Sequence, residues 1–90
     1  MITETDHWLG IDLRHLAALQ AVATEGSFHR AAERLGYTQS AVSQQIAGLE
    51  RIVGMRLVHR PGGPRPISLT EAGHLLLRHG DAMLARLRAG

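Results

Sequence analysis

Apolar residues recur along residues 39–53 at offsets of four, three and four positions, and they predict a helix with one buried side. Thr38 precedes this helix as an N-cap, and its apolar residues are Val42, Ile46, Leu49 and Val53. The other side lacks the charges usual on an exposed helix face and carries Gln39, Ser40, Ser43, Gln44 and Ala47. Amide and hydroxyl groups bind base edges in the major groove of DNA, so we interpret this segment as a recognition helix.

Two further helices are predicted before the recognition helix. Ser27 caps a short helix that Gly36 ends, and its apolar residues recur at helical spacing: Phe28, Ala31, Ala32 and Leu35. With the recognition helix it forms a predicted helix-turn-helix over residues 28–47. Asp12 caps an earlier helix over residues 13–25 that Gly26 ends, with a predicted apolar side of Leu13, Leu16, Leu19, Val22 and Ala23. The three helices are expected to share one core.

Residues 55–60 and 67–69 alternate apolar and polar positions and predict two short strands. The residues between them are rich in Gly and Pro and predict a loop. The strands and the loop form a predicted β-hairpin wing. Arg65 lies in the loop, and wings of this kind lie along the DNA backbone or place arginine in the minor groove, where the negative potential is strongest at narrow A·T tracts. An ordinary surface hairpin is the alternative.

A helix of about twenty residues is predicted from Thr70, its N-cap, to the end of the chain. It carries an apolar stripe of Ala72, Leu76, Gly80, Met83 and Leu87, which is longer than the end of one small domain covers. We therefore expect this helix to pair with that of a second chain through Leu76, Met83 and Leu87. The predicted fold is mainly α: a winged helix-turn-helix with a three-helix core and a two-stranded wing, followed by a long C-terminal linker helix. Residues 1–11 are expected to form a leader anchored by Trp8, residues 12–69 the DNA-binding domain, and residues 70–90 the linker.

Composition narrows the function. The chain has 90 residues and no cysteine, which excludes disulfides and cysteine-based zinc fingers. His74 and His79 are five residues apart, which misses the spacing of a helical metal pair, so no metal or cofactor is expected. No apolar run reaches the ~20 residues of a membrane span, and a soluble, cytoplasmic protein is expected. All ten basic residues are arginines, and six of them lie in residues 27–65, as attraction to phosphates requires.

An ordered series of short segments resembles LysR-type transcriptional regulators over roughly residues 12–75. The segments are DLRHL at 12–16, EGSF at 25–28, AAERL at 31–35, QSAVSQQI at 39–46, LE at 49–50, GMRLVHR at 54–60 and LTEAG at 69–73. Each segment alone is weakly specific, whereas the ordered set is specific. The resemblance implies a bacterial regulator that binds an interrupted palindrome in double-stranded DNA as a dimer or tetramer. It also implies that a small-molecule effector binds in a further C-terminal domain, absent from this chain.

The resemblance assigns roles to individual residues. Gln39, Ser40, Ser43 and Gln44 match positions that contact bases and phosphates, while Ser27, Arg30 and Thr38 match backbone-contacting or capping positions. Arg65 matches a wing arginine used in the minor groove, and we expect Arg60 to act on phosphates as well. The family often has proline at the position of Ser40 and arginine at the position of Gln44. The Gln44 amide suits adenine where arginine prefers guanine, so the preferred site is expected to differ.

Three alternatives compete with specific DNA binding. A winged-helix module that binds protein would tolerate acidic or apolar residues on the face from Gln39 to Ala47, and none is present. A catalytic domain needs a nucleophile or an acid–base set in a cleft, and no such set stands out in the sequence, so we expect no enzyme. A nonspecific architectural DNA binder would be indifferent to sequence, whereas the glutamines and serines of the recognition helix favour base readout.

Overall fold

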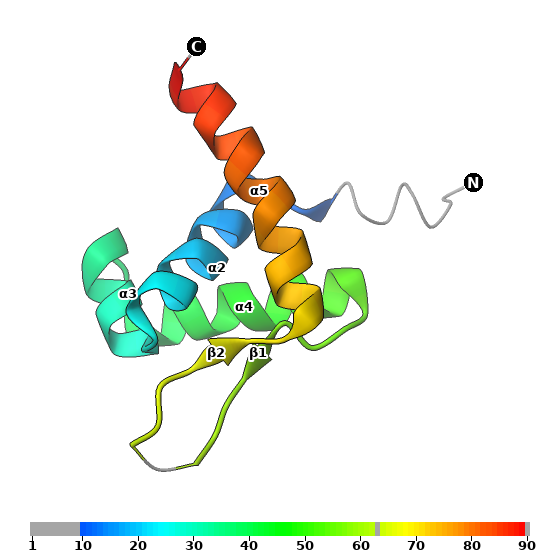
Figure 1. Ribbon diagram of the computed structural model, residues 1–90. Helices are drawn as coiled ribbons and strands as arrows, with labels where there is room; N and C mark the ends of the chain where they lie inside the picture. The colour runs from blue at the N-terminus through cyan, green and yellow to red at the C-terminus, as the bar shows by residue number, and fades with distance from the viewer. Residues whose placement is uncertain (1–9, 63, 90) are drawn as a thin grey trace.

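The computed structural model describes residues 10–62 and 64–89, except for the side chains of residues 83, 84, 87 and 88. The element order is α2 (Leu13–Glu25), α3 (Phe28–Leu35), α4 (Gln39–Val53), β1 (Val58–His59), β2 (Ser68–Leu69) and α5 (Glu71–Ala89). Figure 1 shows α2, α3 and α4 packed together, the wing extending from one side, and α5 rising past α2 on the way to the opposite side. Most of the predicted leader, including Trp8, lies outside the described residues. The winged helix-turn-helix fold is confirmed.

The predicted helix boundaries at 13–25, 28–35 and 39–53 are confirmed. They are predictable because local signals define them. The Asp12 carboxylate accepts the backbone N–H groups of Arg14 (2.8 Å) and His15 (3.3 Å). His15 Nδ1 in turn accepts the N–H of Asp12 at 3.1 Å, so a histidine completes a reciprocal capping box. Gly26, Gly36 and Gly54 follow the three helices in the left-handed conformation that ends helices.

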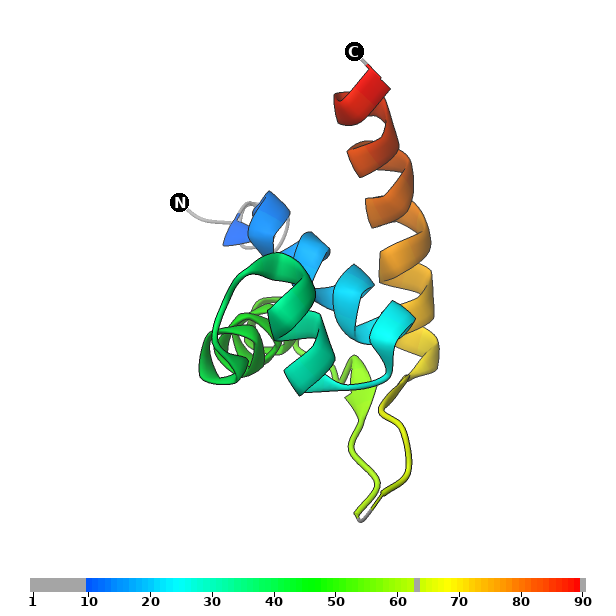
Figure 2. The same ribbon diagram turned by 90° about the vertical axis from the view of Figure 1, so that its left-hand side faces the viewer.

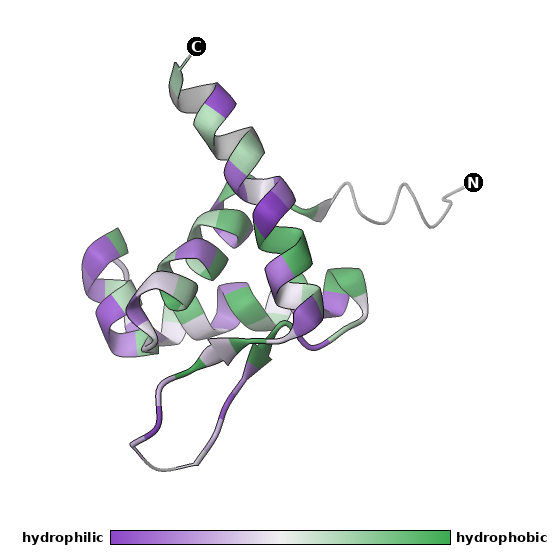
Figure 3. Ribbon diagram, viewed as in Figure 1, coloured by the Kyte–Doolittle hydropathy of each residue, from purple (hydrophilic) through white to green (hydrophobic). Residues whose placement is uncertain are grey.

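The core lies between α2, α3 and α4 and extends to the base of the wing. Its largest fully buried side chains are Leu19, Val22, Val42, Ile46, Leu49, Leu57 and Val58. Figure 3 shows hydrophilic residues on the outer side of α3, away from this core. The expectation for Leu13 was wrong: it is exposed, and Ala18 and Ala21 are buried in α2 instead. The buried face of α2 is thus rotated toward its alanines, which allow the neighbouring helices to approach closely.

The wing is antiparallel, with Val58 opposite Leu69 and His59 opposite Ser68. Each strand has two residues, so the alternation over 55–60 predicted a first strand that is too long. Three prolines lie at positions 61, 64 and 66, and proline has no N–H for a strand ladder. The ladder therefore stops where the prolines begin. Just before the second strand, the N–H of Ile67 donates to the carbonyl of Gly26 at 2.9 Å, which ties the wing to the end of α2.

Helix α5 starts at the wing and crosses α2 (Figure 2). Thr70 Oγ1 accepts the N–H of Gly73 at 3.0 Å as the predicted N-cap, and its hydroxyl donates to the carbonyl of Arg56 at 2.7 Å. Farther along, Gly80 is buried beside α2, and the neighbouring Asp81 accepts a hydrogen bond from the Gln20 side chain at 2.7 Å. These contacts fix the direction of α5 relative to the helix-turn-helix.

The predicted apolar stripe of α5 serves partly within its own domain. Leu76, with Ala72 and Leu77, packs against the core of the same chain, while Leu75 is 53% exposed. The expectation that the domain leaves this stripe uncovered is therefore wrong for the first two turns of α5. The side chains of Met83 and Leu87 lie outside those the structure describes. Among residues 10–62 and 64–89, no helix is long and apolar enough to cross a membrane.

Candidate nucleic-acid interface

Helix α4 presents a polar surface backed by the core. Gln39, Ser40 and Gln44 are exposed, while Val42 and Ile46 on the opposite side are fully buried. Ser43 is half-buried, contrary to the expectation of a fully outward side chain. At 3.6 residues per turn, a residue three positions before Ile46 lies only about 60° from it around the helix, at the border of the buried side. The outward amides thus stand on a helix that the core holds in place.

Two hydroxyl groups cap the helices of the helix-turn-helix. Ser27 Oγ accepts the N–H of Arg30 at 3.2 Å, and Thr38 Oγ1 accepts the N–H of Ala41 at 3.0 Å. Each hydroxyl keeps its own hydrogen for an outside acceptor. The Arg30 side chain is exposed in the first turn of α3. A helix N-terminus carries partial positive charge, so these two helix starts suit the oxygen atoms of phosphates.

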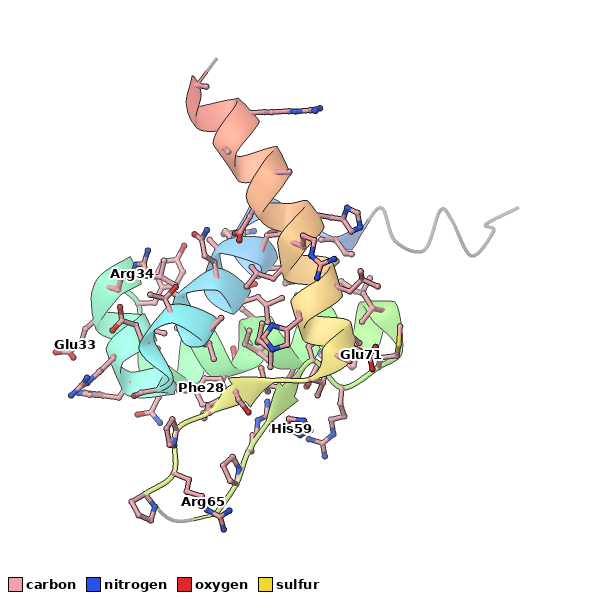
Figure 4. The ribbon with its side chains drawn as sticks, viewed as in Figure 1. Phe28, Glu33, Arg34, His59, Arg65 and Glu71 are labelled. Atoms are coloured by element: carbon pink, nitrogen blue, oxygen red, sulfur yellow. The ribbon has the colours of Figure 1, made fainter. Side chains whose placement is uncertain are left out.

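A hollow lies between the starts of α3 and α4 and the wing. Four of the predicted site residues, Ser27, Gln39, Arg60 and Arg65, line it together with His29. Figure 4 shows Arg65 on the wing loop, away from the helices, and Phe28 where α3 meets the base of the wing. The fold thus brings the predicted wing residues to the same side as the start of the recognition helix. Gln44 lies farther along α4 and does not line this hollow.

Arg60 has contacts within the chain that sequence reasoning missed. Its Nη2 lies 3.8 Å from Glu50 Oε1, and its guanidinium carbon lies 5.4 Å from the centre of the Phe28 ring. Glu50 Oε2 also accepts the N–H groups of Leu57 (2.8 Å) and Val58 (3.4 Å). One signal was present in the sequence: a carboxylate in the last turn of a helix is unfavourable beside the negative end of the dipole unless it has partners.

Another arginine near the helix-turn-helix also has a partner. Arg34 Nη1 in α3 lies 3.7 Å from Glu25 Oε2 at the end of α2. Both side chains are partly exposed, so the pair contributes little to stability in water. The local excess of arginine therefore overstates the charge that is available to an outside partner.

The comparisons with known proteins agree with this geometry. Residues 13–74 match the family model described as "Bacterial regulatory helix-turn-helix protein, lysR family". The chain is 52% identical over 77 residues to a probable RuBisCO transcriptional regulator of Cyanophora paradoxa, which covers 86% of this chain and 23% of that protein. The aligned part is thus about a quarter of the length of that curated relative.

Solved structures of other proteins also resemble this chain. The crystal structure of a "BenM_DBD/benA site 1 DNA complex" superposes with a TM-score of 0.80 at 35% identity, covering 88% of this chain and 86% of that chain. The crystal structure of ArgP from Mycobacterium tuberculosis superposes with a TM-score of 0.72 at 51% identity, covering 83% of this chain and 27% of that chain. The similarity therefore extends over the winged helix-turn-helix and most of the chain described here.

Proposed function

The chain belongs to the lysR family of bacterial regulatory helix-turn-helix proteins, and from this premise we propose that it recognises specific DNA sequences as part of a transcription regulator. The observation that carries the proposal is the exposure of Gln39, Ser40 and Gln44 on the first turns of a helix whose other side is buried. The first turns of a recognition helix enter the major groove most deeply. Among these residues, Gln44 is assigned to base reading. The half-buried Ser43 has a shorter side chain and is assigned to a phosphate contact.

The remaining site residues are assigned to the DNA backbone and the minor groove. Ser27 and Thr38 cap the starts of α3 and α4, and Arg30 is exposed in the first turn of α3. Arg65 on the wing is assigned to the minor groove of the flanking sequence. The similar BenM domain was solved in complex with DNA, which supports DNA binding by this fold.

The chain is proposed to bind as a homodimer through α5. An apolar groove between the end of α4 and α5 is lined by Met55, Leu75 and Leu76, among others. With Met83 and Leu87 farther along the helix, it gives two chains an apolar surface to share. Two-fold pairing would present two recognition helices to an interrupted palindrome. We assign residues 12–69 to DNA binding and residues 70–90 to the linker and dimerisation.

The chain spans less than a third of the length of these two relatives, so the functions of a whole regulator are proposals. We assign effector binding to a domain outside this sequence, and we propose that the present domain needs no cofactor, catalyses no reaction and acts in the cytoplasm. A protein-binding winged helix is the second candidate, but the uncharged amides on α4 favour DNA.

Selection of bound fragments from a random duplex pool tests the proposal. We expect a consensus with two-fold symmetry and affinity that falls steeply with salt. Retention of random duplexes without any consensus would identify a nonspecific architectural binder. Failure to retain any duplex at low salt would contradict DNA binding and favour the protein-binding alternative.

A further inference from the structure

Glu50 joins the recognition helix to the base of the wing. Its side chain, 14% exposed in the last turn of α4, accepts the N–H groups of Leu57 and Val58. Its backbone carbonyl accepts the N–H groups of Gly54 (2.8 Å) and Met55 (3.3 Å). One residue therefore holds both the end of α4 and the start of the wing. Hydrogen bonds to a carboxylate are stronger than those between neutral groups.

Arg60 extends this connection to α3. It lies just past β1 and is placed between the Glu50 carboxylate and the Phe28 ring. Phe28 is the first residue of α3 and packs against the core. A guanidinium suits this position because its plane stacks on an aromatic ring while its edge faces a carboxylate. The wing is thereby attached to both helices of the helix-turn-helix.

We propose that Glu50, Arg60 and Phe28 form a clamp that sets the direction of the wing relative to the recognition helix. In this role Arg60 is a positioning residue for Arg65 and not a phosphate contact in its own right. The loop beyond the clamp contains Pro61, and each of its prolines restricts the backbone. The chain takes five residue-to-residue steps of up to about 3.3 Å each from Arg60 to Arg65, so a small rotation at the base displaces the Arg65 guanidinium by several ångströms.

The consequence for DNA rests on the proposed function, and the two possible roles of Arg60 give opposite results for Glu50→Gln. If Arg60 binds a phosphate, loss of the Glu50 charge releases the arginine and removes a negative charge from the interface, so binding becomes tighter. If Glu50 and Arg60 form a clamp, the same substitution moves the wing, so binding becomes weaker. The amide of glutamine still has an oxygen that accepts N–H groups, which limits the disturbance to the fold.

The experiment measures binding to the duplex that the wild-type chain selects from a random pool, in versions with A·T-rich and G·C-rich flanks. We expect Glu50→Gln to weaken binding to the A·T-flanked duplex on the order of tenfold, the effect of one lost charged contact, and to abolish the preference between flanks. The matched control is Glu25→Gln, which removes the same charge from the pair with Arg34 between α2 and α3, in which no wing residue takes part. It should leave the flank preference unchanged.

Two further variants separate positioning from charge. Phe28→Leu removes the ring without altering any charge and should also reduce the flank preference; a phosphate contact by Arg60 predicts no change. Arg65→Ala should add less than a further twofold loss in the Glu50→Gln background, because the misplaced arginine no longer reaches its groove. Full additivity of the two substitutions, or tighter binding by Glu50→Gln, would overturn the clamp. Phe28→Leu keeps the test decisive if Glu50→Gln fails to fold.

Measurements on the unbound protein distinguish failure of the clamp from failure of DNA binding. Residual dipolar couplings should show the amides of the wing in a new orientation relative to α4 in Glu50→Gln and in Phe28→Leu, but not in Glu25→Gln. Amides of Leu57 and Val58 should also exchange with solvent faster in Glu50→Gln. A wild-type chain that selects no duplex would contradict the proposed function alone. A wing with unchanged orientation in both clamp variants would overturn the clamp, whatever the DNA result.

Discussion

The α-carbon of Gly73 lies directly against the backbone carbonyl of Leu57, so a Cβ at Gly73 would overlap the Leu57 oxygen. That oxygen also accepts the N–H of Thr70 at 3.0 Å. The N–H of Leu57 meanwhile donates to Glu50. One residue at the base of the wing is therefore held by α4 on one side and by the start of α5 on the other.

Gly73→Ala should destabilise the domain. Its new Cβ meets backbone, which cannot move without shifting the wing or α5, and overpacking of this kind costs about 1–3 kcal/mol. The gain in helix propensity from glycine to alanine, about 1 kcal/mol, matches only the lower end of that range, and a clash with backbone belongs at its upper end. Urea denaturation should show a net decrease in the free energy of unfolding.

Gly80→Ala is the matched control on the same helix. Its Cβ would lie 3.1 Å from Leu16 Cδ2, the end of a flexible side chain that is able to adjust. The propensity gain is the same, so the free energy of unfolding should fall less than in Gly73→Ala. Equal effects of the two substitutions would contradict the special role of the Gly73 contact.

Much of the fold is predictable because its signals are local. Caps at Asp12, Ser27 and Thr38 and the glycines after each helix determine the helix ends, and the periodicity of α4 determines its buried side. Such signals depend on hydrogen bonds within a few residues along the chain. The same local signals identified the amides of Gln39 and Gln44 as outward residues.

The missed features depend on residues distant in sequence. The place of Glu50 in the last turn of α4 indicates that its carboxylate needs a partner, but the partner is known only when folding brings β1 within reach. The closeness of Gly73 to Leu57 likewise arises only when α5 packs on the base of the wing. Leu13 and Leu16 have the same chemistry, yet Leu16 is buried beside Gly80 of α5 and Leu13 is exposed.

Acid should weaken the cap of α2. Slight desolvation raises the pKa of Asp12, but the backbone N–H groups of His15 and Arg14 and the nearby positive charges lower it more, so the net pKa lies below its ordinary value of 3.8. A lowered pKa in the folded state stabilises the fold above the unfolded pKa, and this stabilisation is lost as pH falls through the folded pKa.

The Asp12→Asn variant isolates this effect because it keeps a capping oxygen and lacks the titration. The difference in the free energy of unfolding between wild type and Asp12→Asn should shrink below about pH 4. Urea unfolding at each pH measures it. Parallel curves down to pH 2.5 would show that the carboxylate charge is immaterial to the cap.

Arg30 and Arg65 should contribute through charge. Replacement of either by alanine should weaken binding on all sequences and flatten the slope of log affinity against log salt by roughly one unit per chain. Arg65→Ala should in addition reduce the preference for A·T-rich flanks. Arg14→Ala, at the start of α2 beside Asp12, is the control for net charge and should leave the slope unchanged. An unchanged slope for Arg65→Ala would remove the wing from the interface.

Pairing through α5 should be measurable by sedimentation of the isolated chain. Wild type should form a dimer, and Leu87→Glu should dissociate it, since a charged side chain would replace one leucine of the proposed interface in each chain, at about 1.5–3 kcal/mol each, or more than a hundredfold in affinity. His74→Glu, at an exposed position on the same helix, is the control and should remain dimeric. A wild-type chain that is monomeric at high concentration, both alone and on DNA, would contradict pairing.

Gln44 provides the sharpest test of base readout, because it is exposed on the polar side of α4 one turn after Ser40. Its amide offers one donor and one acceptor, which match adenine N6 and N7, and a good bidentate pair discriminates by about 1–3 kcal/mol. Gln44→Arg should shift one symmetric pair of operator positions toward guanine. Gln44→Ala should relax the same positions with little loss on nonspecific DNA. Selection from a random pool reports both results, with Gln45→Ala, a half-buried neighbour, as the matched control. If all variants select one consensus, Gln44 does not read a base, and α4 must lie in the groove at a different rotation.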